Sequence, residues 1–154
     1  MVKVLFVCHG NICRSPMAEF IMKDMTSKAG LNDIYIASAA TSTEEIWNGI
    51  GNPIYPPARE ILKRKGIPFG DHRAVQITRD DYKRYDLIVA MDSANVRNIM
   101  RITGGDPEKK IKRLLEYCGV SRDVADPWYS GDFETAYNDI YKGCEAMVRM
   151  LSEK

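Results

Sequence analysis

The sequence predicts one α/β domain over residues 1–154, built in three layers with an open, mostly parallel, four-stranded sheet and helices on both faces. Three observations lead to this fold class. Short apolar runs alternate with stretches of helical periodicity, the first apolar run leads directly into a glycine-containing loop, and the chain is long enough to bury one ordinary core.

The first strand, the first helix and the second strand are expected in that order. Residues 2–7 are rich in β-branched side chains and are typical of a buried parallel strand. Ser15 is a suitable N-cap residue, Pro16 suits the first helical position, and Gly30 fits the end of that helix. A second strand is expected over residues 34–39.

The middle of the chain predicts a long loop followed by two helices and a strand. Residues 41–57 are rich in Gly and Pro, and such a loop is more often the wall of a site than part of the scaffold. A helix is expected over residues 57–65 and ends at Gly66. Residues 87–91 predict a third strand, and residues 94–102 predict the next helix.

The C-terminal part supplies the last strand and the clearest helix. Residues 111–115 mix apolar and basic side chains and are interpreted as the final strand. Apolar residues then keep helical spacing from residue 133 to residue 151, which indicates one continuous buried face. Asp132 is the expected N-cap of this last helix.

The composition argues against several classes of function. The chain carries 22 Lys and Arg against 21 Asp and Glu, so no overall charge attracts it to nucleic acid or to an anionic membrane. The first apolar run is too short for a membrane span or a secretory signal. The four cysteines form no C-x-x-C pair and only two histidines are present, so no metal site is expected. These features predict a cytoplasmic protein with reduced thiols.

The segment "VCHGNICRSP" places polar and reactive side chains directly after the first strand. In open α/β sheets, ligands bind beyond the carboxyl ends of the strands, and the backbone N–H groups of such a loop can surround a phosphate group. The same positive field favours the thiolate form of Cys8, which is the nucleophilic form. Arg14 follows after five residues and can donate two parallel hydrogen bonds to phosphoryl oxygens. The C-x5-R spacing therefore predicts a phosphate-binding loop that also holds a nucleophile.

This loop, together with "DPWY" near the other end of the chain, resembles the low-molecular-weight protein tyrosine phosphatase family over nearly the whole length. The resemblance implies hydrolysis of phosphotyrosine on proteins, without a metal or an organic cofactor. Cys8 would attack phosphorus and form a phosphocysteine, while Arg14 stabilises the transition state. Asp126 would first protonate the leaving phenolate and would then activate water as a base.

Further residues match supporting positions of the family. Asn11 would shape the loop, and Ser38 and His72 would hold that asparagine. Ser15 would donate a hydrogen bond to the thiolate, and Asp92 would orient the arginine. The implied phosphate-binding loop consists of Cys8, His9, Gly10, Asn11, Ile12, Cys13, Arg14 and Ser15. No catalytic role is expected for the histidine within it.

Apolar residues are expected to form the walls of a cleft that accepts an aromatic ring, because selectivity for phosphotyrosine comes largely from depth and apolar lining. The candidates are Ile12, Trp47, Trp128 and Tyr129. Cys13 has two interpretations. It either fills space beneath the start of the helix or forms a disulfide with oxidised Cys8 and protects it, as the adjacent cysteine of the family does.

Three related classes of protein share this loop. Protein arginine phosphatases have threonine where this chain has Ile12, whose bulky apolar side chain favours an aryl ring. Thioredoxin-linked arsenate reductases need further cysteines, and residues 80–100 contain none. Cysteine-phosphorylated carriers of sugar transport do not need a late acid such as Asp126. A phosphotyrosine phosphatase is therefore the preferred interpretation, and a protein arginine phosphatase is the main alternative.

The expected partners follow from this interpretation. They are tyrosine-phosphorylated proteins or peptides as substrates, and phosphate or vanadate-like anions as ligands of the loop. Neither nucleic acid nor a membrane is expected as a partner, and the chain is expected to be a monomer or a weak dimer.

Overall fold

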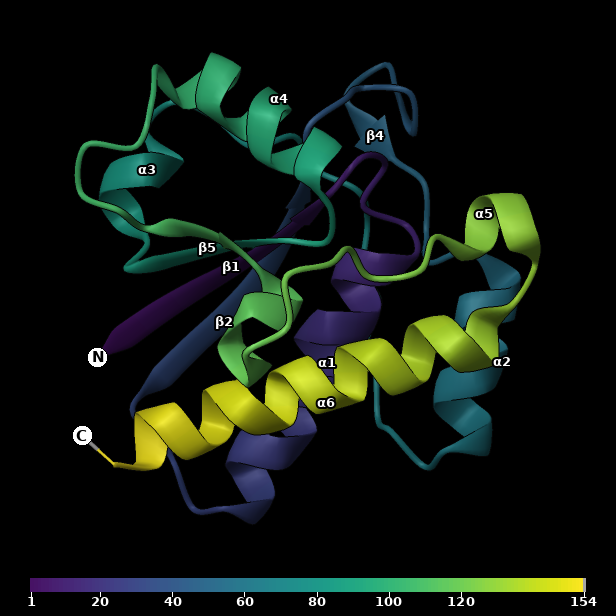
Figure 1. Cartoon of the computed structure of the whole chain (residues 1–154). Helices are drawn as coiled ribbons and strands as arrows, with labels where there is room; N and C mark the ends of the chain where they lie inside the picture. The colour runs from purple at the N-terminus through teal and green to yellow at the C-terminus, as the bar shows by residue number, and fades with distance from the viewer. Residues whose placement is uncertain (154) are drawn as a thin grey trace.

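The structure, a computed structural model, describes residues 1–153 and is built around a four-stranded sheet. The strand order is β2-β1-β5-β6, and each neighbouring pair is parallel. The strands are β1 (Val2–Cys8), β2 (Ile34–Ala40), β5 (Leu87–Ala90) and β6 (Ile111–Arg113). Figure 1 shows helices on both sides of this sheet, so the predicted three-layer α/β fold is confirmed.

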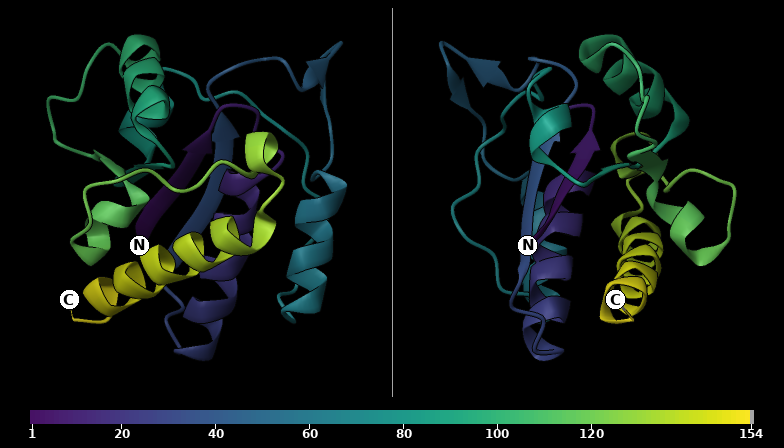
Figure 2. Two further views of the ribbon diagram at one scale, coloured as in Figure 1. Left: turned by 45° about the vertical axis from the view of Figure 1, so that its right-hand side comes forward. Right: turned by 90° about the vertical axis from the view of Figure 1, so that its left-hand side faces the viewer.

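The helical segments fill the two outer layers. They are α1 (Arg14–Lys28), α2 (Pro56–Arg64), α3 (Asp81–Arg84), α4 (Ser93–Thr103), the 3-10 helix η1 (Leu114–Cys118), α5 (Pro127–Ser130) and α6 (Phe133–Ser152). In Figure 1, α3 and α4 lie above the sheet, while α1 and α6 lie below it. The left view of Figure 2 shows α6 passing across α1, the right view shows the two helices next to each other, and they are in contact.

The side chains of β1 alternate between two hydrophobic clusters. Val4 and Phe6 point to the cluster that α1, α2 and α6 complete, whereas Leu5 and Val7 point to the cluster that α3 and α4 complete. All four side chains are at most 2% exposed, as expected for a strand of a parallel sheet that is covered on both faces. This explains why the first strand appears in the sequence as an unbroken apolar run.

The start of α1 differs from the sequence-based expectation. The helix begins at Arg14 with Cys13 as its N-cap residue, and no side chain caps it. Ser15 therefore lies inside the first turn, where its hydroxyl group bonds to side chains of the preceding loop instead of a backbone N–H group. Pro16 is tolerated because the N–H groups of the first turn have no helical acceptor. Gly30, with a φ of 71°, follows the helix and confirms its expected end.

The segment 41–57 is not entirely loop. It contains a short antiparallel hairpin of β3 (Ile46–Trp47) and β4 (Ile50–Gly51), and α2 already begins at Pro56. The last strand is also shorter than expected, because η1 starts directly after Arg113. These errors concern elements of two to five residues, whose periodicity is too short to be recognised in a sequence.

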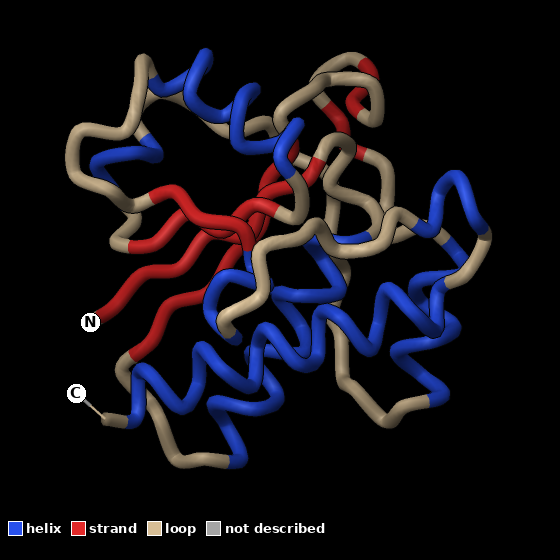
Figure 3. Tube along the Cα trace, in the orientation of Figure 1, coloured by secondary structure: helices blue, strands red, loops and turns tan. Residues whose placement is uncertain are grey.

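The parallel strands bring several loops to one edge of the sheet. The loop after β1, the segment after β2 and Asp92 after β5 all follow the carboxyl ends of neighbouring strands. The chain returns to this edge before α5, where Val124 N–H donates to Met91 O at 2.9 Å. In Figure 3 these tan loops gather beyond the red strands, and they contain the candidate functional residues.

Candidate active site

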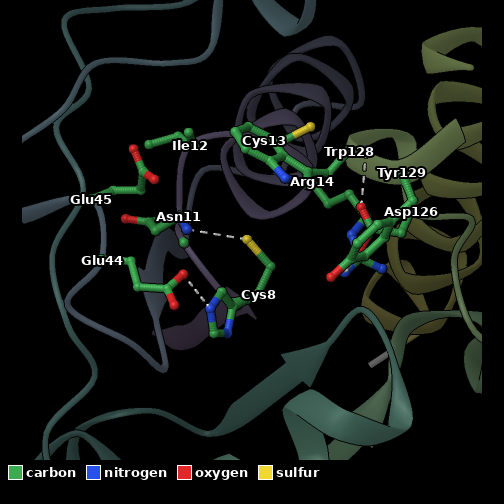
Figure 4. A pocket seen from close by; sticks show the side chains of 12 residues that line it. Cys8, Asn11, Ile12, Cys13, Arg14, Glu44, Glu45, Asp126, Trp128 and Tyr129 are labelled. Carbon is green, nitrogen blue, oxygen red and sulfur yellow. Dashed lines mark hydrogen bonds and ion pairs between the residues drawn. The ribbon is translucent and has the colours of Figure 1, made fainter. Parts of the chain in front are cut away.

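The loop after β1 closes around the sulfur of Cys8. Asn11 adopts a left-handed conformation with a φ of 60°, a conformation that asparagine tolerates better than most residues. This turns its backbone N–H group toward Cys8 Sγ, at a distance of 3.3 Å. Figure 4 shows this contact at the centre of the site. The loop is therefore folded with an N–H donor directed at the thiol.

The side chain of Asn11 holds the loop in this shape. Its Nδ2 atom donates to Ser15 Oγ at 2.8 Å and to Ser38 Oγ at 3.0 Å. Its Oδ1 atom accepts from Val75 N–H at 3.1 Å and lies 3.1 Å from His72 Nε2. Because Asn11 is fully buried, these four contacts satisfy its amide group. Both residues that were expected to hold it, Ser38 and His72, contact its side chain, and Ser15 does so as well.

Glu19 is a member of this network that the sequence interpretation missed. It accepts a hydrogen bond from Ser38 Oγ at 2.6 Å, and it lies 3.7 Å from His72 Nδ1. Lys23 pairs with its other oxygen at 2.6 Å. The residue is only 6% exposed although it is an acid. The available signal was a single acidic residue within the apolar run "PMAEFIM" of α1, because a buried acid needs partners.

Ser15 lies directly beside the thiol. Its Oγ atom is 3.0 Å from Cys8 Sγ, and the residue is fully buried beneath the loop. Because Asn11 Nδ2 already donates to this oxygen, the hydroxyl hydrogen is free to point at the sulfur. The sulfur thus faces two donors, one from the backbone and one from a side chain.

Arg14 lies at the start of α1 and joins three parts of the site. Its Nη2 atom is 2.7 Å from Asp92 Oδ2 and 3.5 Å from Asp126 Oδ2, while Nη1 donates to Val124 O at 3.0 Å. Burial works against the charged guanidinium, but the Cys8 sulfur and the two carboxylates outweigh it and raise the pKa of Arg14. Arg14 therefore stays positively charged although it is 4% exposed.

Asp126 enters the site from the opposite end of the sequence. It is the N-cap residue of α5, and its Oδ1 atom accepts from Trp128 N–H at 3.0 Å. Pro127 occupies the first helical position and has no N–H group that would need an acceptor. The other carboxylate oxygen faces Arg14, so Asp126 lies at the wall of the same cavity as Cys8. Figure 4 shows Asp126 on the far side of the cavity from Asn11.

A cavity of about 250 Å³ opens above the loop. Its lining consists of Cys8, His9, Gly10, Asn11, Ile12, Cys13, Arg14, Glu44, Glu45, Asp126, Trp128 and Tyr129. The ring of Trp128 packs on Tyr55 with 5.0 Å between the ring centroids, so one wall is aromatic. The opposite wall contains Glu44 and Glu45, which the sequence interpretation missed because nothing marks them within the long loop.

Trp47 does not line this cavity, which corrects the expected cleft. It lies on β3, where the hairpin has already led the chain away from the loop, and it is 78% exposed. His9 lines the cavity, with half of its side chain exposed, and its Nε2 atom lies 2.6 Å from Glu44 Oε2. The half-exposed His9 side chain therefore has an acidic partner at the rim of the cavity.

Comparison with known proteins identifies the family. The profile of the family described as low molecular weight phosphotyrosine protein phosphatase matches residues 3–154. The chain belongs to this family. It is 41% identical over 156 residues to the low molecular weight protein-tyrosine-phosphatase YfkJ of Bacillus subtilis. This match covers 100% of this chain and 98% of that protein. A low molecular weight phosphotyrosine protein phosphatase of Schizosaccharomyces pombe is 41% identical over 144 residues, covering 91% of this chain and 88% of that protein.

Solved structures of this phosphatase family share the fold. The crystal structure of YfkJ matches with a TM-score of 0.92 and 40% identity, covering 99% of this chain and 96% of that chain. The crystal structure of a Drosophila arginine phosphatase matches with a TM-score of 0.85 and 30% identity, covering 97% of this chain and 98% of that chain. Because both names occur on one fold, the choice between the two substrates must come from the site.

The cysteines of this phosphatase are all free thiols. Cys13 lines the cavity and is 8% exposed. Burial raises the pKa of the Cys13 thiol, and the nearby sulfur of Cys8 raises it further. Burial alone raises the pKa of Cys144, which lies in the core between α1 and α6. Neither thiol is therefore a strong nucleophile at neutral pH.

Two absences apply to residues 1–153. Over this range, no three or more His, Cys, Asp or Glu side chains are grouped so that they could hold a metal ion. Among the helices of the same range, none has the length and apolar character needed to cross a membrane.

Proposed function

We propose that the chain hydrolyses phosphotyrosine on proteins through a phosphocysteine intermediate. The observation that carries this proposal is the meeting of three groups at one cavity: the thiol of Cys8, the guanidinium of Arg14 and the carboxyl group of Asp126. A phosphate binder without catalysis would need only the loop and the arginine. The additional acid supports an enzyme that cleaves the bond to a poor leaving group.

In the first step, Cys8 Sγ attacks the phosphorus atom. The S–P bond forms and the P–O bond to the phenol breaks, while protonated Asp126 gives its proton to the leaving phenolate oxygen. Arg14 and the N–H groups of the loop stabilise the charge on the remaining phosphoryl oxygens. Asp92 Oδ2 lies 2.7 Å from Arg14 Nη2 and holds the guanidinium in place for its contact with the phosphoryl oxygens.

In the second step, a water molecule attacks the phosphocysteine. The Asp126 carboxylate accepts a proton from this water, the new P–O bond forms, and the S–P bond breaks with its electron pair remaining on sulfur. The hydroxyl group of Ser15 stabilises the departing thiolate from a distance of 3.0 Å. Inorganic phosphate then leaves, and the same loop is expected to bind vanadate-like anions.

The lining of the cavity favours an aromatic substrate. Ile12 supplies an apolar surface within the loop, and Trp128 and Tyr129 supply aromatic surfaces opposite to it. A phenyl ring can pack between such walls, whereas the short side chain of phosphoserine would not reach the thiol from the rim. Hydrolysis of phosphoarginine on proteins is the second candidate function, because a similar solved structure is that of a Drosophila arginine phosphatase.

Four free cysteines support a reducing, cytoplasmic location for this phosphatase. The proposal further takes residues 1–154 as one domain that acts as a monomer or a weak dimer, with tyrosine-phosphorylated proteins as its partners. It requires no cofactor, because the loop amides and Arg14 supply the positive charge.

The test compares hydrolysis of matched phosphotyrosine, phosphoserine and phosphoarginine peptides in the presence of EDTA. The variants are Cys8→Ser, Ile12→Thr and the control Ile102→Thr, which changes a half-buried isoleucine of α4. We expect the phosphotyrosine peptide to be the best substrate of the wild type. Hydrolysis of the phosphoarginine peptide should increase only in the Ile12→Thr variant. A wild-type preference for phosphoarginine would overturn the substrate, and a stable phosphocysteine without turnover would indicate a carrier.

A further inference from the structure

The proposed acid lies at the end of an irregular segment. Residues 119–126 connect η1 with α5, and Asp126 is the last of them. A side chain at the end of such a segment keeps its direction only if the backbone before it is held. Three hydrogen bonds to distant parts of the chain hold the backbone of the two residues before Asp126, Val124 and Ala125.

Two of these bonds act on Val124. Its N–H group donates to the carbonyl oxygen of Met91, which directly follows β5, and its own carbonyl group accepts from Arg14 Nη1. The third bond acts one residue later, where Ala125 N–H donates to Asp139 Oδ2 at 3.1 Å. Asp139 is therefore the partner of the amide group immediately before the proposed acid.

Asp139 is an acid on the buried face of α6. It is 4% exposed, and its two oxygens accept hydrogen bonds of 2.8 and 3.0 Å from the two Nη atoms of Arg122. Arg122 Nη1 also donates to Asp123 O, so the arginine folds back on its own segment. Figure 1 shows the segment that leads into α5 running along α6. Within the described residues 1–153, the donors to Asp139 thus all come from residues 122–125.

This arrangement is more than α6 needs for packing. A buried carboxylate is costly, and an apolar side chain of similar size would often stabilise a core as well or better. Burial would raise the pKa of Asp139, but the hydrogen bonds from Arg122 and Ala125 outweigh it and hold that pKa below its usual range. Asp139 is therefore an anion, with its charge directed at the segment that carries Asp126.

We propose that Asp139 is a positioning residue, which fixes the backbone before Asp126 and so directs the proposed acid toward the leaving group. The inference rests on the proposed acid role of Asp126. A catalytic group displaced by about 1 Å can lose roughly a hundredfold in rate, so one anchoring bond can matter even though Asp139 never touches substrate.

The test is a double-mutant cycle of Asp139→Asn with Asp126→Asn. For each variant, kcat/KM is measured with phenyl phosphate, a poor leaving group, and with 4-nitrophenyl phosphate, a good one. We expect Asp139→Asn to lose about tenfold or more with phenyl phosphate and less than about threefold with 4-nitrophenyl phosphate. In the Asp126→Asn background, Asp139→Asn causes no further leaving-group-dependent loss.

A structural control separates positioning from simple destabilisation. Asp106 accepts N–H bonds from Lys110 and Ile111 in a distant loop, so Asp106→Asn removes the charge of a similar anchor. Its thermal stability falls, while the ratio of the two kcat/KM values stays at the wild-type value. If Asp139→Asn does not fold, Asp139→Glu keeps the charge and moves the carboxylate by one methylene, and the same selective loss is expected.

Two outcomes overturn the inference. An equal loss with both substrates, or an equally large loss in the Asp126→Asn background, means that Asp139 does not act through Asp126. A failure of the proposed function has a different signature. In that case, Asp126→Asn by itself would lose the same factor in kcat/KM with phenyl phosphate and with 4-nitrophenyl phosphate.

Discussion

Ser15 Oγ lies 3.0 Å from Cys8 Sγ, and Asn11 fixes the direction in which this hydroxyl group can donate. Asn11 Nδ2 donates to the same oxygen at 2.8 Å, which leaves the hydroxyl hydrogen of Ser15 for the sulfur. The backbone N–H group of Asn11 approaches the sulfur from another side. Two donors therefore face the sulfur that the proposed mechanism uses as the nucleophile of the first step and as the leaving group of the second.

Replacing Ser15 with alanine should slow the second step more than the first. A hydrogen bond to a charged group contributes about 1.5–3 kcal/mol, so hydrolysis of the phosphocysteine should fall roughly ten- to a hundredfold. Rapid-quench kinetics with 4-nitrophenyl phosphate should show a burst of nitrophenol followed by slow turnover. Ser152→Ala, which removes a hydroxyl group that bonds within α6, serves as the control. An unchanged steady-state rate would contradict this role of Ser15.

Replacing Arg14 with lysine should be nearly as damaging as removing the side chain. The guanidinium reaches Asp92 and Val124 O with different nitrogen atoms, and a lysine amine cannot keep both contacts and also bind two phosphoryl oxygens. We expect kcat/KM for an aryl phosphate to fall by about a hundred- to a thousandfold. Arg97→Lys, on the exposed face of α4, controls for the chemical change. Near-normal activity of Arg14→Lys would exclude the bidentate contact.

The strands and long helices could be predicted because they extend over many residues with one pattern. The apolar run of β1 and the periodic face of α6 each result from burial along a whole element. The hairpin of β3 and β4, and the single turns α3 and α5, could not be predicted in the same way. Their few residues contain only about one period, and tertiary contacts decide their conformation.

The catalytic loop could be predicted because its chemistry is local in sequence, with Cys8 and Arg14 separated by five residues. Contacts between distant residues could not be derived from spacing. Glu19 and Asp139 are buried acids whose partners lie in other segments, and Glu44 reaches the cavity only because its loop folds over it. The position of Trp47 outside the cavity could not be predicted, because an exposed aromatic residue and one that lines a cleft have the same sequence signal.

The raised pKa of Cys13 predicts how its reaction with oxidised Cys8 depends on pH. Burial is the main cause of the raised pKa, and the Cys8 sulfur adds to it, so less thiolate is present at a given pH than in free cysteine. Disulfide formation requires this thiolate. If Cys13 traps oxidised Cys8, trapping should be slow near neutral pH and should accelerate about tenfold for each added pH unit below the pKa.

This prediction can be measured after brief peroxide treatment at one fixed pH and a jump to pH values from about 7 to 9. Alkylation of free thiols and mass spectrometry then give the rate of disulfide formation. Cys13→Ser should abolish the disulfide and the recovery of activity with thiol, whereas Cys118→Ser should change neither. A rate that does not change with pH would mean that Cys13 is not the attacking thiol.

The two walls of the cavity predict which neighbours of phosphotyrosine are preferred. Glu44 and Glu45 form one wall, and Glu45 packs so closely over the loop that a side chain at Gly10 would meet it at 3.2 Å. His9 and Asn52 hold these two carboxylates through contacts of 2.6 and 3.0 Å. Peptides with a lysine beside phosphotyrosine should therefore have a higher kcat/KM than peptides with a glutamate there.

The size of this preference follows from the exposure of the wall. Partly exposed ion pairs contribute about 0.2–1 kcal/mol, so each glutamate should account for a factor of roughly one and a half to five. We expect the ratio of kcat/KM between the two peptides to approach one in the double variant Glu44→Gln and Glu45→Gln. High salt should have the same effect on the wild type, since exposed charges are screened. Glu145→Gln, on the exposed face of α6, should leave the ratio unchanged. A wild-type ratio that ignores both the flanking charge and the salt concentration would show that substrates do not contact this wall.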